Sequence, residues 1–129
     1  MNTDREEAIG PEAQLTQKIL AAAFKVLNAL GCGFLEKVYE NALLLELRRS
    51  GIRTEQQKGF HVLYDGAIVG EYQADLVVDG RVIVECKAAS TLDSIHEAQL
   101  LNYLKAVGIR VGLLLNFGRP RLQYRRFIA

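Results

Sequence analysis

The sequence has few of the residues that would indicate a secreted, zinc-binding or membrane protein. It contains no tryptophan, two prolines and two cysteines, and no apolar run approaches the ~18 residues that a membrane span requires. Cys32 and Cys86 form no Cys-x-x-Cys pair, so neither a disulfide framework nor a cysteine zinc site is indicated. The first ten residues lack a basic stretch followed by an apolar one, which argues against a signal peptide. We therefore expect a cytoplasmic protein with reduced thiols and no membrane partner.

The chain also carries no large excess of positive or negative charge. Sixteen Lys and Arg stand against fifteen Asp and Glu, a net charge of +1, so any contact with nucleic acid must depend on a local basic patch. The basic cluster between residues 119 and 126 is more typical of a solvated face. Half of the 129 residues are hydrophobic, which is enough for one compact domain. We expect a single domain over 1–129, with residues 1–10 as a flexible N-terminus.

Two helices are predicted in the first half of the chain. Pro11 suits a first helical position, and apolar residues at helical spacing continue to Gly31, which suits a helix end. The second helix lies within 33–51 and ends at Gly51. Its predicted buried side comprises Leu35, Val38, Tyr39, Ala42, Leu45 and Leu47.

A mixed β-sheet is predicted from the rest of the chain. Strand-like runs near 58–64, 67–78 and 81–88 are joined by two Asp-Gly dipeptides, which are strong hairpin signals. A helix opened by a capping box of Ser94 and Glu97 follows and ends at Gly108. The later strands are expected at 110–117, parallel to 81–88 through a crossover helix, and at 121–129 on an edge. The fold class is therefore α/β (mixed α+β), with a mixed sheet flanked by helices in the order ααβββαββ.

The third predicted strand is apolar enough to be buried, yet two charged residues lie at its end. Residues two apart in a strand share a face, so Glu85 and Lys87 project together while Cys86 points toward the core. Taken alone, the two charges could simply neutralise each other. Asp75 on the preceding strand and Glu36 in the second helix offer two further carboxylates. Three converging carboxylates favour a bound cation, and oxygen ligands favour Mg²⁺ or Mn²⁺, an arrangement suited to phosphodiester hydrolysis.

Such a site requires a particular hairpin. A two-residue turn at Asp79 and Gly80 would pair Asp75 with Val84 and send Asp75 and Glu85 to opposite faces. A three-residue loop with Gly80 in the left-handed conformation, or a bulge, would bring odd-numbered residues 75, 83, 85 and 87 to one face. The site hypothesis therefore predicts the turn type.

Four separate stretches resemble one known family. "GFLEKVYENAL" contains G-x-x-E-x-x-Y at Gly33, Glu36 and Tyr39. Together with "ADLVVDGRVIVECKA", "EAQLLNYLKA" and "VGLLLNFG", it closely resembles the GxxExxY protein family, a branch of the PD-(D/E)XK nuclease superfamily. The resemblance spans nearly the whole chain and implies a restriction-endonuclease-like core. It is more specific than D-x9-E-x-K alone, which has many chance matches.

The resemblance also implies a role for each matching residue. Glu36, Asp75 and Glu85 would hold Mg²⁺ or Mn²⁺, and Lys87 would be the catalytic lysine. Gln99 matches the glutamine often found on the following helix. Tyr39 and Tyr103 are candidates to line the cleft, although an aromatic residue on an amphipathic helix is often part of the core. Ala74 stands where the superfamily pattern has proline, which is not a ligand.

The expected activity is metal-dependent hydrolysis of nucleic acid, either DNA or RNA. The alternatives are an inactive nucleic-acid-binding or regulatory module on the same fold, and a protein-interaction module. The chain has little beyond a core fold to supply specificity, so a homodimer or a protein partner is expected to provide it. His61 and His96 are expected at the surface without catalytic roles, and neither has metal-ligand spacing.

Overall fold

The computed structural model describes residues 9–129. Most of the expected flexible N-terminus, residues 1–8, lies outside this part of the chain. The element order is ααβββαββ, as predicted. The elements are α2 (Ala13–Leu30), α3 (Glu36–Arg49), β1 (Thr54–Tyr64), β2 (Ala67–Val78), β3 (Val82–Lys87), α4 (Ser94–Val107), β4 (Val111–Asn116) and β5 (Gln123–Ile128).

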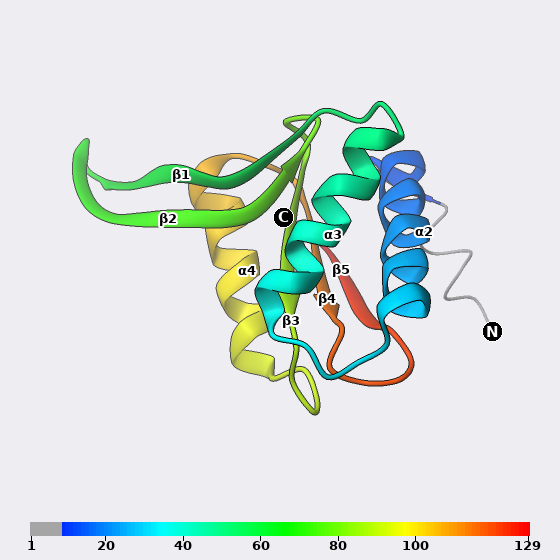
Figure 1. Cartoon of the computed structure of the whole chain (residues 1–129). Coiled ribbons are helices and arrows are strands. Elements are labelled where there is room, and N and C mark those ends of the chain that lie inside the picture. The colour runs from blue at the N-terminus through cyan, green and yellow to red at the C-terminus, as the bar shows by residue number, and fades with distance from the viewer. Residues whose placement is uncertain (1–8) are drawn as a thin grey trace.

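The strands form one mixed sheet with helices on both faces. Their order is β1-β2-β3-β4-β5, and only β3 and β4 run parallel to each other. This confirms the predicted crossover through α4 and the edge position of β5. Figure 1 shows α2 and α3 on one side of the sheet and α4 on the other, while the β1–β2 hairpin extends beyond both layers. No helix within 9–129 is long and apolar enough to cross a membrane.

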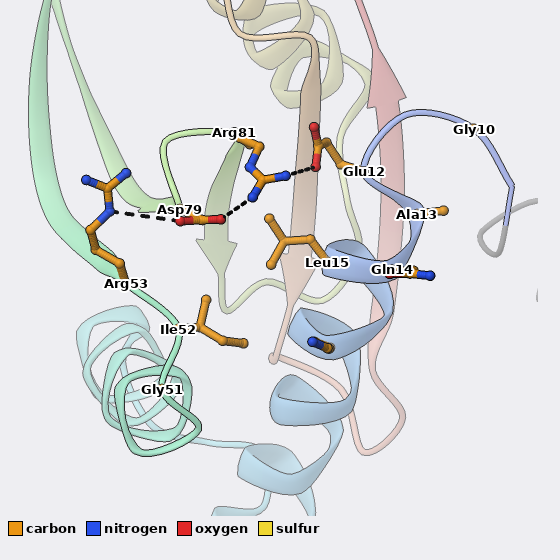
Figure 2. A pocket seen from close by; sticks show the side chains of 11 residues that line it. Gly10, Glu12, Ala13, Gln14, Leu15, Gly51, Ile52, Arg53, Asp79 and Arg81 are labelled. Atoms are coloured by element: carbon orange, nitrogen blue, oxygen red, sulfur yellow. Dashed lines mark hydrogen bonds and ion pairs between the residues drawn. The ribbon is translucent and has the colours of Figure 1, made fainter.

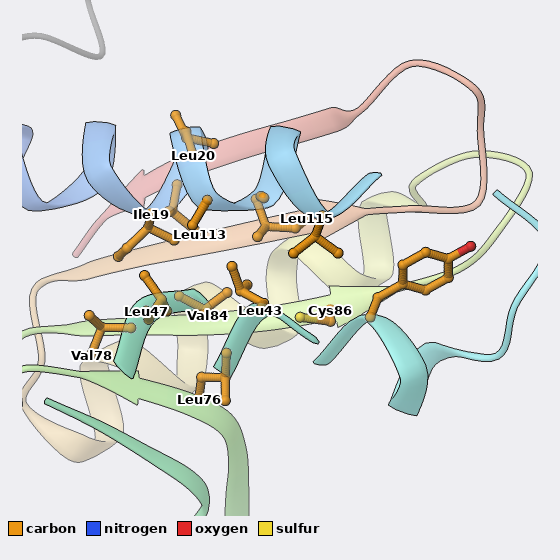
Figure 3. Close-up of a cluster of buried hydrophobic side chains, with 14 of the residues drawn as sticks. Ile19, Leu20, Leu43, Leu47, Leu76, Val78, Val84, Cys86, Leu113 and Leu115 are labelled. Atoms are coloured by element: carbon orange, nitrogen blue, oxygen red, sulfur yellow. The ribbon is translucent and has the colours of Figure 1, made fainter. Parts of the chain in front are cut away.

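Alternating side chains of the central strands supply two cores. The larger core lies between the sheet and the α2–α3 layer, where Leu43 and Leu47 of α3 meet Val84 and Cys86 of β3 (Figure 3). The smaller core lies under α4 and includes Ile83. Cys86 is 1% exposed, and burial raises the pKa of its thiol well above the usual range, as expected of a core cysteine.

Three local predictions were inaccurate. Strand β1 begins at Thr54 rather than near residue 58. The N-cap of α4 is Asp93, not Ser94, because the Asp93 carboxylate accepts a hydrogen bond from the backbone N–H of Ile95. The predicted buried side of α3 was also partly wrong, since Leu35 is 82% exposed while the omitted Leu43 is fully buried. Leucines surround this helix, so periodicity alone did not identify the packed side.

Candidate active site

The turn between β2 and β3 sets the register of the candidate site. Val78 pairs with Val82 and Leu76 with Val84, so the connection is a three-residue loop. Gly80 is left-handed at φ 66°, and Asp79 is also left-handed at φ 54°. The predicted turn type is therefore confirmed, and the register aligns Asp75 with Glu85.

Asp75 and Glu85 are linked where β2 and β3 separate. The backbone N–H of Asp75 donates to Glu85 Oε2 at 3.1 Å, and the backbone N–H of Cys86 donates to Asp75 Oδ2 at 2.9 Å. Carboxylate oxygens thus accept hydrogen bonds from the backbone of the neighbouring strand at this point. The two acidic groups and the ends of both strands form a single hydrogen-bonded unit.

The two carboxylates line different hollows, although each accepts a hydrogen bond from the backbone of the other's strand. Ala74 and Val77 both pack in the core under α4, whereas Leu76 packs in the other core, so the alternation of β2 breaks beside Asp75. Asp75 lines a hollow beneath α3, while Glu85 lines a hollow against α4. The expectation that both side chains occupy one face is corrected accordingly, because Asp75 lies at an irregular position of its strand.

The hollow against α4 collects several predicted residues. Glu85 and Lys87 line it, as their spacing predicted, together with Gln99 and Tyr103 of α4. Tyr103 stacks on Tyr72 with ring centroids 4.0 Å apart. The Tyr72 hydroxyl donates a hydrogen bond of 2.7 Å to Glu85 Oε2. Tyr72 therefore orients the Glu85 carboxylate, a contact that sequence reasoning missed.

His96 also lines this hollow. The side chain is partly buried rather than at the surface as expected. Its Nδ1 is buried and has no hydrogen-bond partner within the described residues. His61, in contrast, is exposed on β1 and lies 3.8 Å from Glu71.

The hollow beneath α3 has a volume of about 470 Å³ and contains two residues that sequence reasoning missed. Glu40 of α3 is 3% exposed, and Gln57 of β1 lies between it and Asp75. The Gln57 side chain donates to Glu40 Oε2 at 3.0 Å and to Asp75 Oδ1 at 3.2 Å. Glu40 directly follows buried Tyr39, and a charged residue on the packed side of a helix was the available signal.

The surroundings of the G-x-x-E-x-x-Y residues decide between the two predictions for Tyr39, and they favour the buried side of the helix. Tyr39 is fully buried, stacks on Phe117 at 4.9 Å, and therefore does not line a cleft. Its hydroxyl donates to Gly31 O at 2.6 Å and accepts from the Phe34 N–H at 3.1 Å, which fixes the loop between α2 and α3. Gly33 in this loop has φ 119°, a conformation that favours glycine.

Removing the Tyr39 hydroxyl tests this structural role. We expect Tyr39→Phe to lower the free energy of unfolding by about 1–2 kcal/mol, because the loop groups at Gly31 and Phe34 lose their partner. Tyr64→Phe is the matched control, since Tyr64 is 70% exposed at the hairpin tip. Urea unfolding of both variants would provide the comparison, and equal stabilities would contradict the role.

Glu36, the first residue of α3, is exposed. Within residues 9–129, no three His, Cys, Asp or Glu side chains are grouped so that they could hold a metal ion. The expected convergence of Glu36, Asp75 and Glu85 at one point is therefore not present in this arrangement. Glu36 lines the hollow beneath α3 with Asp75 and with Glu40, which lies one turn later on the same side of the helix, whereas Glu85 lines the hollow against α4.

The electrostatics of the two remaining carboxylates fit a divalent cation. Burial, followed by the charge of Asp75, raises the pKa of Glu85 to about 7. Burial also raises the pKa of Asp75, and the negative charge of Glu40 adds to the effect. Adjacent buried carboxylates of this kind are stabilised by a cation, and their oxygen donors match the preference of Mg²⁺ and Mn²⁺. The residues present thus fit the expected metal in their chemistry.

The segment after Lys87 is held by a buried amide. Asn116 at the end of β4 is fully buried; its Oδ1 accepts from the Ala89 N–H at 2.9 Å, and its Nδ2 donates to Ala89 O at 2.9 Å. The backbone N–H of Gly118 also donates to Asn116 Oδ1, at 3.0 Å. These bonds join the chain that leaves β3 to the chain that leaves β4, and so support the position of Lys87.

A larger cavity, of about 640 Å³, lies away from these residues, beside the N-terminal end of α2 and the β2–β3 turn. Figure 2 shows ion pairs among its charged groups: Arg81 lies between Glu12 and Asp79, and Arg53 approaches Asp79 from the other side. The carboxylates and the lysine suited to phosphodiester chemistry are all elsewhere, so we do not assign the active site to this cavity.

Comparisons with known proteins agree with this fold. No curated protein matches the chain. A solved structure titled "Crystal structure of SSO0001" is similar to the chain with a TM-score of 0.57 and 14% sequence identity. The alignment covers 91% of this chain and 59% of that one, and because the identity is only 14%, the likeness concerns the fold alone. The family model described as the PD-(D/E)XK nuclease superfamily matches residues 13–127. Because this match covers nearly the whole chain, the protein belongs to the PD-(D/E)XK nuclease superfamily.

Proposed function

We propose that the protein is a divalent-metal-dependent nuclease that hydrolyses phosphodiester bonds in DNA or RNA. The observation that carries this proposal is the hydrogen-bonded pair of Asp75 and Glu85 where β2 and β3 separate, with Lys87 beside it. Membership in the nuclease superfamily supports the same reading.

The chemistry assigns separate roles to the side chains. Asp75 and Glu85 would hold Mg²⁺ or Mn²⁺, which when bound would supply a Lewis acid for the scissile phosphate. The Lys87 ammonium would stabilise the negative charge that develops on the phosphate. The Gln99 amide, exposed in the first half of α4, would orient the substrate from the other wall of the hollow.

We also propose that the chain belongs to the GxxExxY branch of the superfamily. The left-handed conformation of Gly33 and the hydrogen bonds of the Tyr39 hydroxyl explain why these two motif positions carry glycine and tyrosine. Glu36, exposed at the start of α3, is the remaining position and would face substrate or solvent. Specificity beyond this core would come from a second copy of the chain or from a protein partner.

A cleavage assay tests the proposed function. Purified protein is incubated with labelled single- and double-stranded DNA and RNA, in Mg²⁺, Mn²⁺ or EDTA. We expect cleavage of at least one substrate with metal and none with EDTA, because the carboxylates need a cation to engage the phosphate. Binding of nucleic acid without cleavage under every condition would overturn the nuclease assignment and favour an inactive binding module.

A further inference from the structure

Glu40 is a buried carboxylate without a buried cationic partner. Three donors converge on its Oε2: Lys37 Nζ at 3.0 Å, Gln56 Nε2 at 2.7 Å and Gln57 Nε2 at 3.0 Å. The Lys37 side chain is 57% exposed, so the buried contacts come from the two neutral amides. Burying a carboxylate is costly, and amide hydrogen bonds offset only part of that cost. A carboxylate held in this way is well suited to receive a cation.

Gln57 joins Glu40 to Asp75. A carboxamide nitrogen carries two hydrogens, and Gln57 Nε2 lies 3.0 Å from Glu40 Oε2 and 3.2 Å from Asp75 Oδ1. The nitrogen can therefore donate one hydrogen to each carboxylate. A divalent cation shared by these two oxygens would need the place that this nitrogen occupies.

The backbone of β1 is distorted to allow this contact. Consecutive residues of a regular strand point to opposite faces, yet the side chains of Gln56 and Gln57 both reach Glu40. Gln57 has φ 51°, the left-handed region that non-glycine residues rarely adopt. Such strain persists only where surrounding contacts enforce it, and it is concentrated at functional sites.

We propose that Glu40, rather than Glu36, is the α3 carboxylate of the metal site, and that the Gln57 amide occupies the place between Glu40 and Asp75 until a divalent cation displaces it. This inference rests on the proposed metal-dependent function. It also accounts for the absence of a group of three metal-binding side chains within residues 9–129, because the amide takes up the space in which the donors would converge.

The first experiment measures Mn²⁺ binding by electron paramagnetic resonance of the free ion. Gln57→Ala should bind Mn²⁺ about tenfold more tightly than wild type, since the ion no longer displaces an amide that donates two hydrogen bonds. Gln56→Ala is the matched control, because Gln56 contacts Glu40 and Asn41 but not Asp75, and it should bind within about threefold of wild type. Equal or weaker binding by Gln57→Ala would overturn the displacement step.

The second experiment compares two glutamates one turn apart on α3. Glu40→Gln should weaken Mn²⁺ binding at least about tenfold, and Glu36→Gln should leave it within about twofold. Both changes preserve side-chain shape, and circular dichroism would check that both variants fold. The opposite ranking would overturn the assignment of Glu40.

A third measurement uses the unaltered protein, so its result does not depend on whether the variants fold. The measurement is nuclear magnetic resonance of the side-chain amides, in which the Gln57 signals are assigned by their absence from the spectrum of Gln57→Gly. On addition of Mg²⁺, the chemical shifts of the Gln57 amide should change more than those of the Gln56 amide. An unmoved Gln57 resonance at saturating Mg²⁺ would overturn the inference. Failure of every variant and of wild type to bind any metal would overturn the proposed nuclease site as well, whereas tight metal binding without cleavage would leave this inference standing.

Discussion

Replacing Lys87 by alanine should reduce nucleic-acid cleavage by about 10²-fold or more while leaving the fold intact. The loss is that expected when a preorganised electrostatic group is removed from a phosphoryl site. Lys87 is only partly buried at the end of β3, so the substitution removes little core packing. Turnover and thermal unfolding of both proteins would measure the two effects separately.

Lys105→Ala is the matched control, since Lys105 is an exposed residue in the last turn of α4. It should cleave like wild type. Nucleic-acid affinity should fall far less than turnover in Lys87→Ala, because phosphate binding is shared among several basic side chains. Full cleavage by Lys87→Ala would assign the chemistry to another residue or to a contaminant.

Gly118→Ala should be the most destabilising of the single substitutions considered, at about 3 kcal/mol. A Cβ at this position would lie 2.3 Å from Ala89 O, 2.4 Å from Ala89 N and 2.7 Å from Ala88 C. These are backbone atoms held by Asn116, so no flexible side chain can move aside. We expect a fall in melting temperature of roughly 10 °C, measured by differential scanning calorimetry.

Gly59→Ala provides the comparison for this substitution. A Cβ at Gly59 would meet nothing within 4 Å, so its effect should stay within about 1 kcal/mol. Because Ala88 and Ala89 directly follow Lys87, Gly118→Ala should also reduce cleavage at temperatures where it remains folded. Equal melting temperatures for the two variants would show that the β3–β4 connection tolerates movement.

The sequence by itself determined the element order, the turn after β2 and the common side of Glu85 and Lys87. These features follow from local rules: turn residues select the loop, and strand geometry places residues two apart on one face. The assignments on α3 were less successful. Periodicity correctly placed Tyr39 on the buried side of an amphipathic helix, but it did not show that Glu36 is exposed or that Glu40 faces the sheet.

Only the tertiary structure decided those positions, because they depend on contacts between segments far apart in the chain. Glu40 and Gln57 are 17 residues apart, and Gln57 and Asp75 are 18 apart. The rotation of α3 about its axis is set by the packing of Leu43 and Leu47 against the sheet. The left-handed backbone of Gln57 has no signature in its own sequence neighbourhood, since glutamine does not favour that conformation and the two carboxylates that its side chain contacts lie far away in the sequence.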